Sequence, residues 1–218
     1  MLGWMDNWQY AAQLPTSPWR GQMTVPRKLA LRSTSEGLRL QQQPADELQG
    51  LREQSFGAAG KSIEELNSNL IELGPKLGDY FELKTEFDIG SATEVGWKLF
   101  VGPGESLVIG YDRNTGKLFM DRTHAGVTGF NHDFPARTEA ALKVDSGKLT
   151  LDILVDRSSV ELFAEQGRVT MTNLVFPSAR ARGIEAYSRG GQIASMRFQA
   201  WKLRSVYQRS GRETSERR

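Results

Sequence analysis

Alternation of apolar and polar side chains with a period of two dominates the chain. From Phe81 to Ile89 every second residue is apolar or a threonine, and residues 149–155 repeat the pattern. Because successive side chains of a strand point to opposite faces of a sheet, both segments are predicted to be half-buried β-strands. Further short apolar runs, each predicted to be a strand, occupy residues 97–101, 107–111, 117–120, 159–164, 169–175, 183–187 and 193–203.

Clusters of turn-forming residues separate these runs at close spacing. They are Asn114-Thr115-Gly116, Asp145-Ser146-Gly147, Glu165-Gln166-Gly167 and Arg189-Gly190-Gly191. Each glycine most simply supplies the positive φ of a tight turn. None of these glycines precedes a predicted helix, so a phosphate-binding loop is not favoured. Many short strands joined by close turns predict an all-β fold, an antiparallel β-sandwich or barrel.

Two segments carry helix signals instead. Residues 44–52 have a proline and acidic residues at their start and Arg52 at their end, which predicts a short helix suited to a connector. Ser62 and Glu65 have the spacing of a capping box, and two leucines follow at helical spacing. Residues 61–73 are therefore predicted to be helical, and an extended conformation stays open because tertiary contacts can override so short a signal.

Charge and composition exclude several classes of function. The chain has 218 residues, 28 Lys and Arg against 26 Asp and Glu, two His and no Cys. A nucleic-acid partner is not expected, because the basic excess lies in the polar residues 205–218, which are predicted to be a disordered tail. Without Cys there are no disulfides, thiolate zinc sites or cysteine nucleophiles. No membrane association is expected, and the first residues lack the basic and apolar regions of a signal peptide.

The polar residues offer little catalytic chemistry. His124 and His132 are the only histidines, and both are expected to be solvated loop residues rather than a paired base or metal site. Glycoside hydrolysis needs two carboxyls about 5–9 Å apart, but sequence spacing alone cannot pair the acids. Turns and ion pairs are expected at Asp121-Arg122 and Asp156-Arg157, which lie at predicted strand ends. The sequence thus predicts no catalytic residue, no metal site and no cofactor site in this chain.

The first twenty residues concentrate aromatic rings beside polar side chains. The rings belong to Trp4, Trp8, Tyr10 and Trp19, and the polar neighbours are Asn7, Gln9 and Arg20. Tryptophan rings stack on the apolar faces of sugars, while amide and guanidinium groups pair with sugar hydroxyls. The cluster therefore fits either a carbohydrate subsite or the core of a β domain.

The same residues carry a family likeness. Residues 3–10, Gly-Trp-Met-Asp-Asn-Trp-Gln-Tyr, and residues 15–29 resemble the last propeller blade of glycoside hydrolase family 32, the levanases, inulinases and invertases. Other stretches are similar to the C-terminal β-sandwich of that family, namely Tyr111-Asp112-Arg113, residues 119–123, residues 155–163, Gly167 and Val175-Phe176-Pro177. The likeness covers about residues 1–203. The tetrapeptide Asn-Trp-Gln-Tyr at residues 7–10 favours the bacterial levanase or exo-inulinase branch over plant invertases.

The resemblance implies a concanavalin A-like, lectin-like β-sandwich preceded by a remnant of a β-propeller blade. The implied division is residues 1–43 for the blade remnant, 44–60 for a connector, 61–204 for the sandwich and 205–218 for the tail. Strands without their neighbouring blades expose unpaired edges and apolar side chains. Residues 1–43 are therefore expected either to pack on the sandwich or to drive self-association.

The catalytic motifs of the family are missing from this chain. The resemblance would place a nucleophilic Asp in Trp-Met-Asn-Asp-Pro-Asn-Gly, a stabilising Asp in Arg-Asp-Pro and an acid/base Glu in Glu-Cys, and none of these occurs. Trp4-Met5-Asp6-Asn7 echoes the first motif, but its context is that of the last blade, so Asp6 is not assigned as the nucleophile. The chain is therefore expected to be the C-terminal part of a longer enzyme and inactive alone.

In that parent enzyme, the resemblance assigns substrate binding to Trp4, Asn7 and Trp8 around the terminal fructosyl unit, with Asp6 and Gln9 in support. For each of these residues, a structural role in packing the blade is the alternative to substrate binding. The implied function is that of a fructan- or sucrose-hydrolysing glycosidase whose sandwich supports the missing N-terminal propeller. A fructan-binding module and a structural domain that forms a homo-oligomer are the alternatives. An extracellular or periplasmic bacterial location is favoured for the parent.

Overall fold

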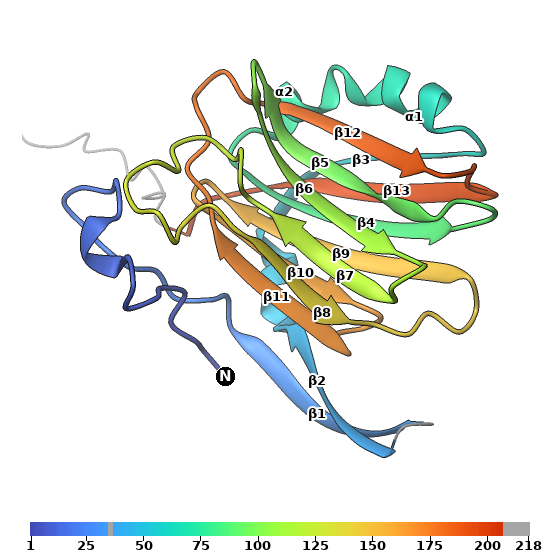
Figure 1. Ribbon diagram of the computed structural model, residues 1–218, viewed down its shortest axis with the longest axis horizontal. Helices are drawn as coiled ribbons and strands as arrows, with labels where there is room; N and C mark the ends of the chain where they lie inside the picture. The colour runs from blue at the N-terminus through green and yellow to red at the C-terminus, as the bar shows by residue number, and fades with distance from the viewer. Residues whose placement is uncertain (35–36, 207–218) are drawn as a thin grey trace, which may run out of the picture.

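Two antiparallel β-sheets stacked face to face form the body of the protein, and a two-stranded hairpin projects beside them (Figure 1). This arrangement is seen in a computed structural model that describes residues 1–34 and 37–206. The predicted disordered tail lies outside the described residues except for Ser205 and Val206. The all-β sandwich expected from the alternating pattern is confirmed.

The first sheet has six strands in the order β11-β10-β9-β4-β13-β3. Its strands are β3 (Arg52–Gly60), β4 (Tyr80–Asp88), β9 (Lys148–Asp156), β10 (Ser159–Ala164), β11 (Val169–Leu174) and β13 (Ser195–Leu203). Every neighbouring pair is antiparallel. One face of this sheet packs into the core, and the other, outer face carries the polar members of each alternating pair.

The second sheet has five strands in the order β12-β5-β6-β7-β8. Its strands are β5 (Glu94–Gly102), β6 (Glu105–Asp112), β7 (Lys117–Asp121), β8 (Arg137–Ala141) and β12 (Gly183–Arg189). The pairing of β6 with β7 brings Tyr111 and Asp112 beside Leu118 and Lys117.

The core lies between the sheets and is built around Trp97 of β5. Its ring is fully buried and meets the rings of Phe87 and Phe198 edge-on, at centroid distances of 6.3 and 5.7 Å. The indole Nε1 donates a hydrogen bond of 3.1 Å to Thr85 Oγ1, so the one polar atom of the ring is satisfied. Each large apolar side chain buried here contributes about 1.5–3 kcal/mol to stability.

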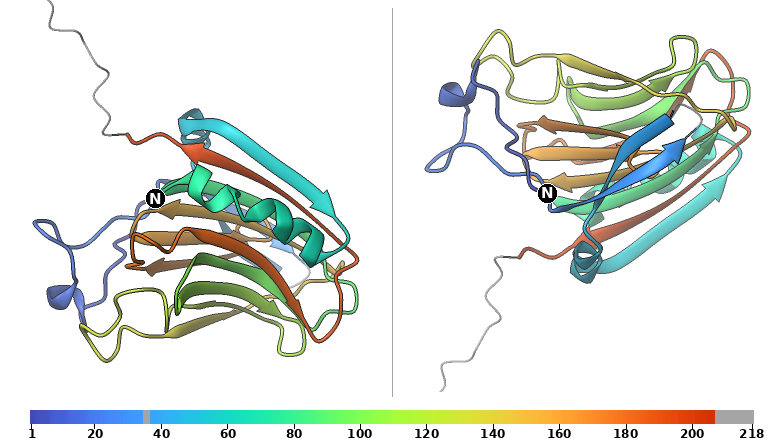
Figure 2. Two further views of the ribbon diagram at one scale, coloured as in Figure 1. Left: turned by 90° about the horizontal axis from the view of Figure 1, so that it is seen from above. Right: turned by 90° about the horizontal axis from the view of Figure 1, so that it is seen from below.

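Two short helices close one open side of the sandwich, where β3 and β12 are edge strands (Figure 2). They are α1 (Ile63–Leu70) and α2 (Leu73–Leu77). Ser62 caps α1 by accepting a hydrogen bond from the Glu65 backbone N–H. The Asn67 side chain both donates to the Ala186 carbonyl and accepts from the Ala186 N–H, each at 2.9 Å. The helix thus satisfies backbone groups of the edge strand β12 that would otherwise be unpaired.

The N-terminal segment, residues 1–44, lies beside the six-stranded sheet. It contains the 3-10 helix η1 (Ala11–Gln13) and the hairpin of β1 (Arg27–Thr34) and β2 (Gly37–Pro44). A second 3-10 helix, η2 (Asp46–Leu51), leads into β3. Of the two expectations for this segment, packing on the sandwich and self-association, the contacts described below support packing.

Most sequence predictions of the elements agree with the structure. Every segment predicted as a strand overlaps an observed strand, and the helical signal of residues 61–73 is confirmed by α1 and α2. Within the helix predicted over residues 44–52, residues 46–51 form the 3-10 helix η2. It ends at Leu51 because β3 begins at the next residue, Arg52. Residues 52–60, assigned to the connector, form β3. Its glycines and alanines show no alternation of large side chains, so the pattern did not reveal this strand.

We expect Asn67→Ala to destabilise the protein by about 2 kcal/mol, because it removes two hydrogen bonds and leaves the Ala186 backbone groups unpaired. Urea unfolding followed by tryptophan fluorescence measures this. Asn69→Ala, on the exposed side of the same helix, is the matched control and should change stability by less than about 0.5 kcal/mol. Equal losses in both variants would contradict the edge-closing role of α1.

Candidate functional site

A buried ion pair joins the N-terminal segment to the six-stranded sheet. Arg27 Nη2 lies 2.5 Å from Glu161 Oε2, and both side chains are almost fully buried. Arg27 also donates to Gln42 Oε1 at 3.0 Å and to Thr172 Oγ1 at 2.7 Å, while Glu161 Oε1 accepts from the Val25 N–H at 2.6 Å. With these partners, both charges are hydrogen-bonded in a site that excludes water, the condition under which buried charges are tolerated.

A second arginine holds the start of the chain. Arg122 is buried, and its guanidinium lies 4.0 Å from the centroid of the Phe134 ring and donates to the Phe134 carbonyl at 2.7 Å. It also donates to the Tyr10 hydroxyl at 3.2 Å and to the Leu174 carbonyl at 3.4 Å. Tyr10 packs edge-on against Phe134. Turns and ion pairs were expected at Asp121-Arg122. Asp121 Oδ1 does accept from the Thr123 N–H in a turn, whereas Arg122 is a buried cation that anchors the aromatic segment.

The aromatic residues predicted to bind substrate lie together at the surface. The rings of Trp4 and Trp8 are 5.2 Å apart, and their exposed fractions are 46% and 88%. Asn7 is exposed and its Oδ1 accepts a hydrogen bond from the Gln9 N–H, so its side chain shapes the turn that carries Trp8. Burial raises the pKa of Asp6, one of whose carboxylate oxygens is buried without a partner. We call Trp4 and Trp8 the aromatic wall.

The loop between β7 and β8 lies against the N-terminal segment, where Asn131 donates to the Gln9 carbonyl, and its residues do not gather into one site. The His132 side chain is exposed beside Asp133, and Phe130 packs against Phe134 and Phe176. Arg137 lies 3.5 Å over the Phe119 ring centroid and pairs with Glu139. Among residues 1–34 and 37–206, no three His, Cys, Asp or Glu side chains gather as a possible metal site, and no helix is long and apolar enough to span a membrane.

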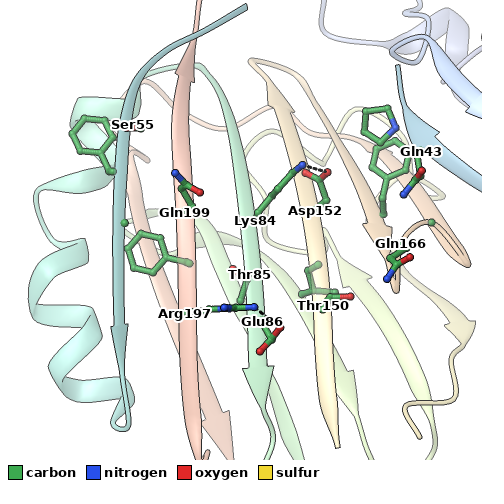
Figure 3. Close-up of a pocket in the computed structure, with 17 residues that line it drawn as sticks. Gln43, Ser55, Lys84, Thr85, Glu86, Thr150, Asp152, Gln166, Arg197 and Gln199 are labelled. Atoms are coloured by element: carbon green, nitrogen blue, oxygen red, sulfur yellow. Dashed lines mark hydrogen bonds and ion pairs between the residues drawn. The ribbon is translucent and has the colours of Figure 1, made fainter. Parts of the chain in front are cut away.

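An open groove of about 620 Å³ lies on the outer face of the six-stranded sheet. Figure 3 shows its floor, where Lys84 and Asp152 face one another at the centre and Ser55 lies on one side. The opposite wall contains Gln43 of the hairpin and Gln166 of the turn between β10 and β11. We call this hollow the sheet groove. None of its residues belongs to the aromatic wall.

A glycine fixes the wall of the sheet groove. The Gln42 N–H donates to the Gly167 carbonyl at 3.0 Å, which ties the hairpin to the turn. Gly167 has a φ of +83°, and a Cβ there would lie 1.9 Å from the Gln42 carbonyl oxygen. Only glycine tolerates this φ and this approach. The turn glycine predicted from sequence is therefore confirmed, and its second role in joining hairpin and sandwich was not visible from sequence.

Four charged side chains form a network in the floor of the sheet groove and beside it. Arg52 makes two hydrogen bonds of 2.6 Å to Glu82, and Lys84 lies 3.3 Å from both Glu82 and Asp152. Burial, and then the nearby Glu82 carboxylate, raises the pKa of Asp152 to about 7, against the opposing effect of Lys84. One carboxylate oxygen of Asp152 is buried and has no hydrogen-bond partner in the protein.

Sequence reasoning did not find the sheet groove. Lys84, Asp152 and Gln199 of its floor are simply the polar members of alternating strand patterns, as exposed strand residues usually are. Only the strand register brings them together, through the pairs Gly57 with Gln199, Gln199 with Lys84, and Lys84 with Asp152.

Comparison with known proteins gives a family match for the N-terminal segment and another for the sandwich. The family "Glycosyl hydrolases family 32 C terminal" matches residues 47–202, and "Glycosyl hydrolases family 32 N-terminal domain" matches residues 1–44. The first match covers more than half of the chain. This chain belongs to glycoside hydrolase family 32. The likeness to levanases, inulinases and invertases stated from sequence is thereby confirmed.

Individual family 32 proteins are similar over nearly the whole chain. A levanase from Bacillus subtilis (strain 168) is 39% identical over 209 residues, which are 94% of this chain and 31% of that protein. An extracellular exo-inulinase from Aspergillus awamori is 33% identical over 94% of this chain and 39% of that protein. The crystal structure of the A. awamori exo-inulinase superposes with a TM-score of 0.79, at 31% identity over 94% of this chain and 40% of that one. The chain thus spans between three and four tenths of these relatives.

We expect Arg27→Ala to destabilise the protein by about 3–5 kcal/mol, because it leaves the Glu161 carboxylate buried without its cation. Urea unfolding measures the loss, and limited proteolysis should cut residues 1–26 faster in the variant. The adjacent Lys28→Ala removes an exposed ion pair with Asp46 and is the matched control, expected to cost about 0–1 kcal/mol. A cost for Arg27→Ala no larger than the control would contradict the anchoring role.

We expect Asp152→Asn to flatten the fall in stability between about pH 4 and pH 7. Folded Asp152 keeps its proton up to about pH 7, whereas the unfolded carboxyl loses it near 3.8, so the folded state binds more protons in this window. Stability contributed by the proton is therefore lost as the pH rises, and the variant cannot lose it. Urea midpoints on both sides of the window measure this. Asp46→Asn, at an exposed carboxylate, should leave the wild-type slope unchanged.

Proposed function

We propose that this chain is the C-terminal part of a fructan- or sucrose-hydrolysing glycosidase in which the sandwich supports the catalytic propeller. The observation that carries this is the buried Arg27–Glu161 pair. Arg27 lies in the segment matched by the N-terminal family domain, and Glu161 lies in the part matched by the C-terminal domain. The two charges are shielded from water and belong to different family domains. Their pairing therefore fixes the last blade rigidly on the sandwich.

The exposed face of the hairpin supports the same proposal. Strand register places Leu29 and Leu31 of β1 on one face with Leu38 and Leu40 of β2, and all four are exposed. A contiguous apolar stripe on a projecting hairpin is characteristic of a contact surface. The occupant we assign to it is the rest of the propeller, because residues 1–44 match the N-terminal domain of the family and this chain spans only three to four tenths of its longer relatives.

This proposal divides the chain into a blade remnant over residues 1–43, a connector, a sandwich that extends to residue 204 and a tail. With β3 included in the sandwich, the connector shortens to residues 44–51. In the whole enzyme Trp4 and Trp8 would form one wall of the fructosyl pocket, with Asn7 holding the turn that carries Trp8. The relatives' names, levanase and exo-inulinase, support a fructan substrate and, for the inulinase, an extracellular location.

The isolated chain is expected not to release fructose from sucrose, inulin or levan. Retaining hydrolysis needs a nucleophile and an acid/base about 5–5.5 Å apart, and the sequence lacks the family motifs that supply them. A reducing-sugar assay with the purified chain measures this. Turnover that is abolished by Asp6→Asn would contradict the prediction, whereas turnover unaffected by that change would indicate a contaminating enzyme.

A chimera tests the supporting role of the sandwich. In it, this chain replaces the matching C-terminal part of the B. subtilis levanase, to which it is 39% identical. We expect the chimera to release fructose from levan. Leu31→Asp should shorten the half-life of its activity on heating, because it places a charge in the proposed contact with the propeller.

Two controls make the chimera result specific. Gln41→Asp lies on the opposite face of the hairpin and should leave the half-life unchanged. Leu31 is exposed in the isolated chain, so Leu31→Asp should not change the urea midpoint of that chain. Equal half-lives of the Leu31→Asp and wild-type chimeras would contradict the proposed role of the hairpin.

A further inference from the structure

Trp8 is held in the aromatic wall through its backbone more than through its ring. The ring is 88% exposed and packs against the ring of Trp4, which is exposed as well. The turn that carries Trp8 is closed by the N–H groups of Tyr10 and Ala11, which donate to the Asn7 carbonyl at 3.0 and 2.8 Å. The position of the Trp8 ring therefore depends on what holds this turn and the helix η1 that follows it.

The two tryptophans are attached to different parts of the sandwich. The backbone of Trp4 pairs with the segment that precedes the hairpin, in which Gln22 Nε2 donates to Ser158 Oγ at 2.8 Å, in the turn before β10. The turn of Trp8 instead meets residues 122–136, which join β7 to β8 and which we call the β7–β8 loop. Because the attachments are separate, a change in this loop can displace Trp8 while Trp4 stays in place.

Asn131 of the β7–β8 loop binds the turn of Trp8 at two points. Its Nδ2 donates to the Gln9 carbonyl at 3.2 Å, next to Trp8, and to Gln13 Oε1 at 2.8 Å, at the end of η1. Its Oδ1 accepts from the Asp133 N–H at 2.8 Å, so the same side chain is fixed within its own loop. One amide thus ties the turn to the loop before η1 and within it.

Buried side chains hold η1 from beneath. Tyr10 and Leu14, on either side of η1, are buried in one cluster with Phe134 of the β7–β8 loop. The Arg122 guanidinium donates to the Tyr10 hydroxyl at 3.2 Å and to the Phe134 carbonyl at 2.7 Å. Arg122 therefore joins the segment to the loop at a point separate from Asn131.

The β7–β8 loop is itself braced by the sandwich. Its base is closed by the Arg122 N–H, which donates to the Ala136 carbonyl at 3.0 Å, and Gly126 forms a parallel bridge with Phe176. Gly126 has a φ of +87°, and a Cβ there would lie 2.0 Å from the Phe176 carbonyl oxygen, so only glycine permits this approach. The ring of Phe130 packs against that of Phe176 at a centroid distance of 5.7 Å. A loop fastened in this way can fix the position of another segment.

From these contacts we propose that the β7–β8 loop sets the position of Trp8 in the aromatic wall, with Asn131 and Arg122 as positioning residues for the terminal fructosyl unit. The role of the wall in binding rests on the proposed function. Neither positioning residue contacts the sugar, and both act through Trp8. An aromatic contact depends on the relative orientation of its partners, so a displaced turn weakens it. The affinity for substrate, and not only the stability of the enzyme, thus depends on the sandwich.

Kinetics of the levanase chimera with Asn131→Asp test this role. The variant keeps the size of the side chain and its acceptor for the Asp133 N–H, but it cannot donate to Gln9 or Gln13. We expect KM to rise about threefold with kcat unchanged, because the wall contacts the sugar alike in the ground state and the transition state. The factor should be the same for levan and sucrose, since both present a terminal fructosyl unit.

Two further variants separate positioning from a general structural effect. His132→Ala changes the next residue of the loop, whose side chain is 88% exposed beside Asp133, and should leave KM unchanged. Trp8→Ala should raise KM by itself. In the Trp8→Ala chimera, Asn131→Asp should have no additional effect, since a positioning residue acts only through the ring that it places.

Hydrogen exchange of the isolated 218-residue chain gives a readout that needs no activity. Asn131→Asp should speed exchange of the amides of residues 10–14 about fivefold, as for one lost hydrogen bond. The amides of residues 22–27, which belong to the attachment of Trp4, should exchange as in the wild type. His132→Ala should change neither segment.

The outcomes distinguish this inference from the proposed function. In an active chimera, an unchanged KM for Asn131→Asp, or a rise that His132→Ala matches or that persists in the Trp8→Ala background, would overturn the positioning role alone. An unchanged exchange pattern would overturn it as well. Trp8→Ala without effect on KM would overturn the proposed role of the wall. An inactive wild-type chimera with the expected exchange pattern would overturn the supporting role of the sandwich and bear out the hold of the β7–β8 loop on the turn of Trp8.

Discussion

The buried pair of Arg27 and Glu161 is the constraint on which the arrangement of the molecule depends. A charge removed from water must find an opposite charge and hydrogen bonds, and here the two side chains provide them for one another across the junction of two family domains. Because Arg27 is the first residue of β1, fixing its guanidinium also fixes the direction in which the hairpin leaves the body. The leucine face of the hairpin and the wall of the sheet groove follow from that direction.

The outer face of the six-stranded sheet carries two distinct features along its width. At the β10 and β11 end it carries Glu161 and Thr172, which receive Arg27. Across β9, β4 and β13 it carries a balanced polar row that is open to solvent. One face can carry both features because alternate side chains of each strand point away from the core. Polar groups at these positions do not disturb the packing around Trp97. The Arg27–Glu161 pair and the sheet groove thus both lie where the hairpin contacts the six-stranded sheet.

The aromatic wall and the sheet groove differ in what they can contribute to binding. An aromatic contact contributes about 0.5–1.5 kcal/mol, and a millimolar dissociation constant already needs about 4 kcal/mol. Under the proposed function, the wall therefore needs further groups from the rest of the propeller to hold a fructosyl unit. The groove brings several hydrogen-bonding side chains together within this chain, among them Ser55 of β3, Lys84 of β4, Asp152 of β9 and Gln199 of β13.

The sequence by itself determined the period-two strands, the glycine turns, the helix capped by Ser62 and the family likeness, because these depend on residues close together in the chain. Tertiary structure decided the rest. Nothing near Arg122 in the sequence indicates that it lies beneath Tyr10, and nothing near Glu161 indicates Arg27, 134 residues away. The groove likewise exists only through register, since pairing between strands far apart in sequence decides which exposed polar side chains become neighbours, and no local pattern records that pairing.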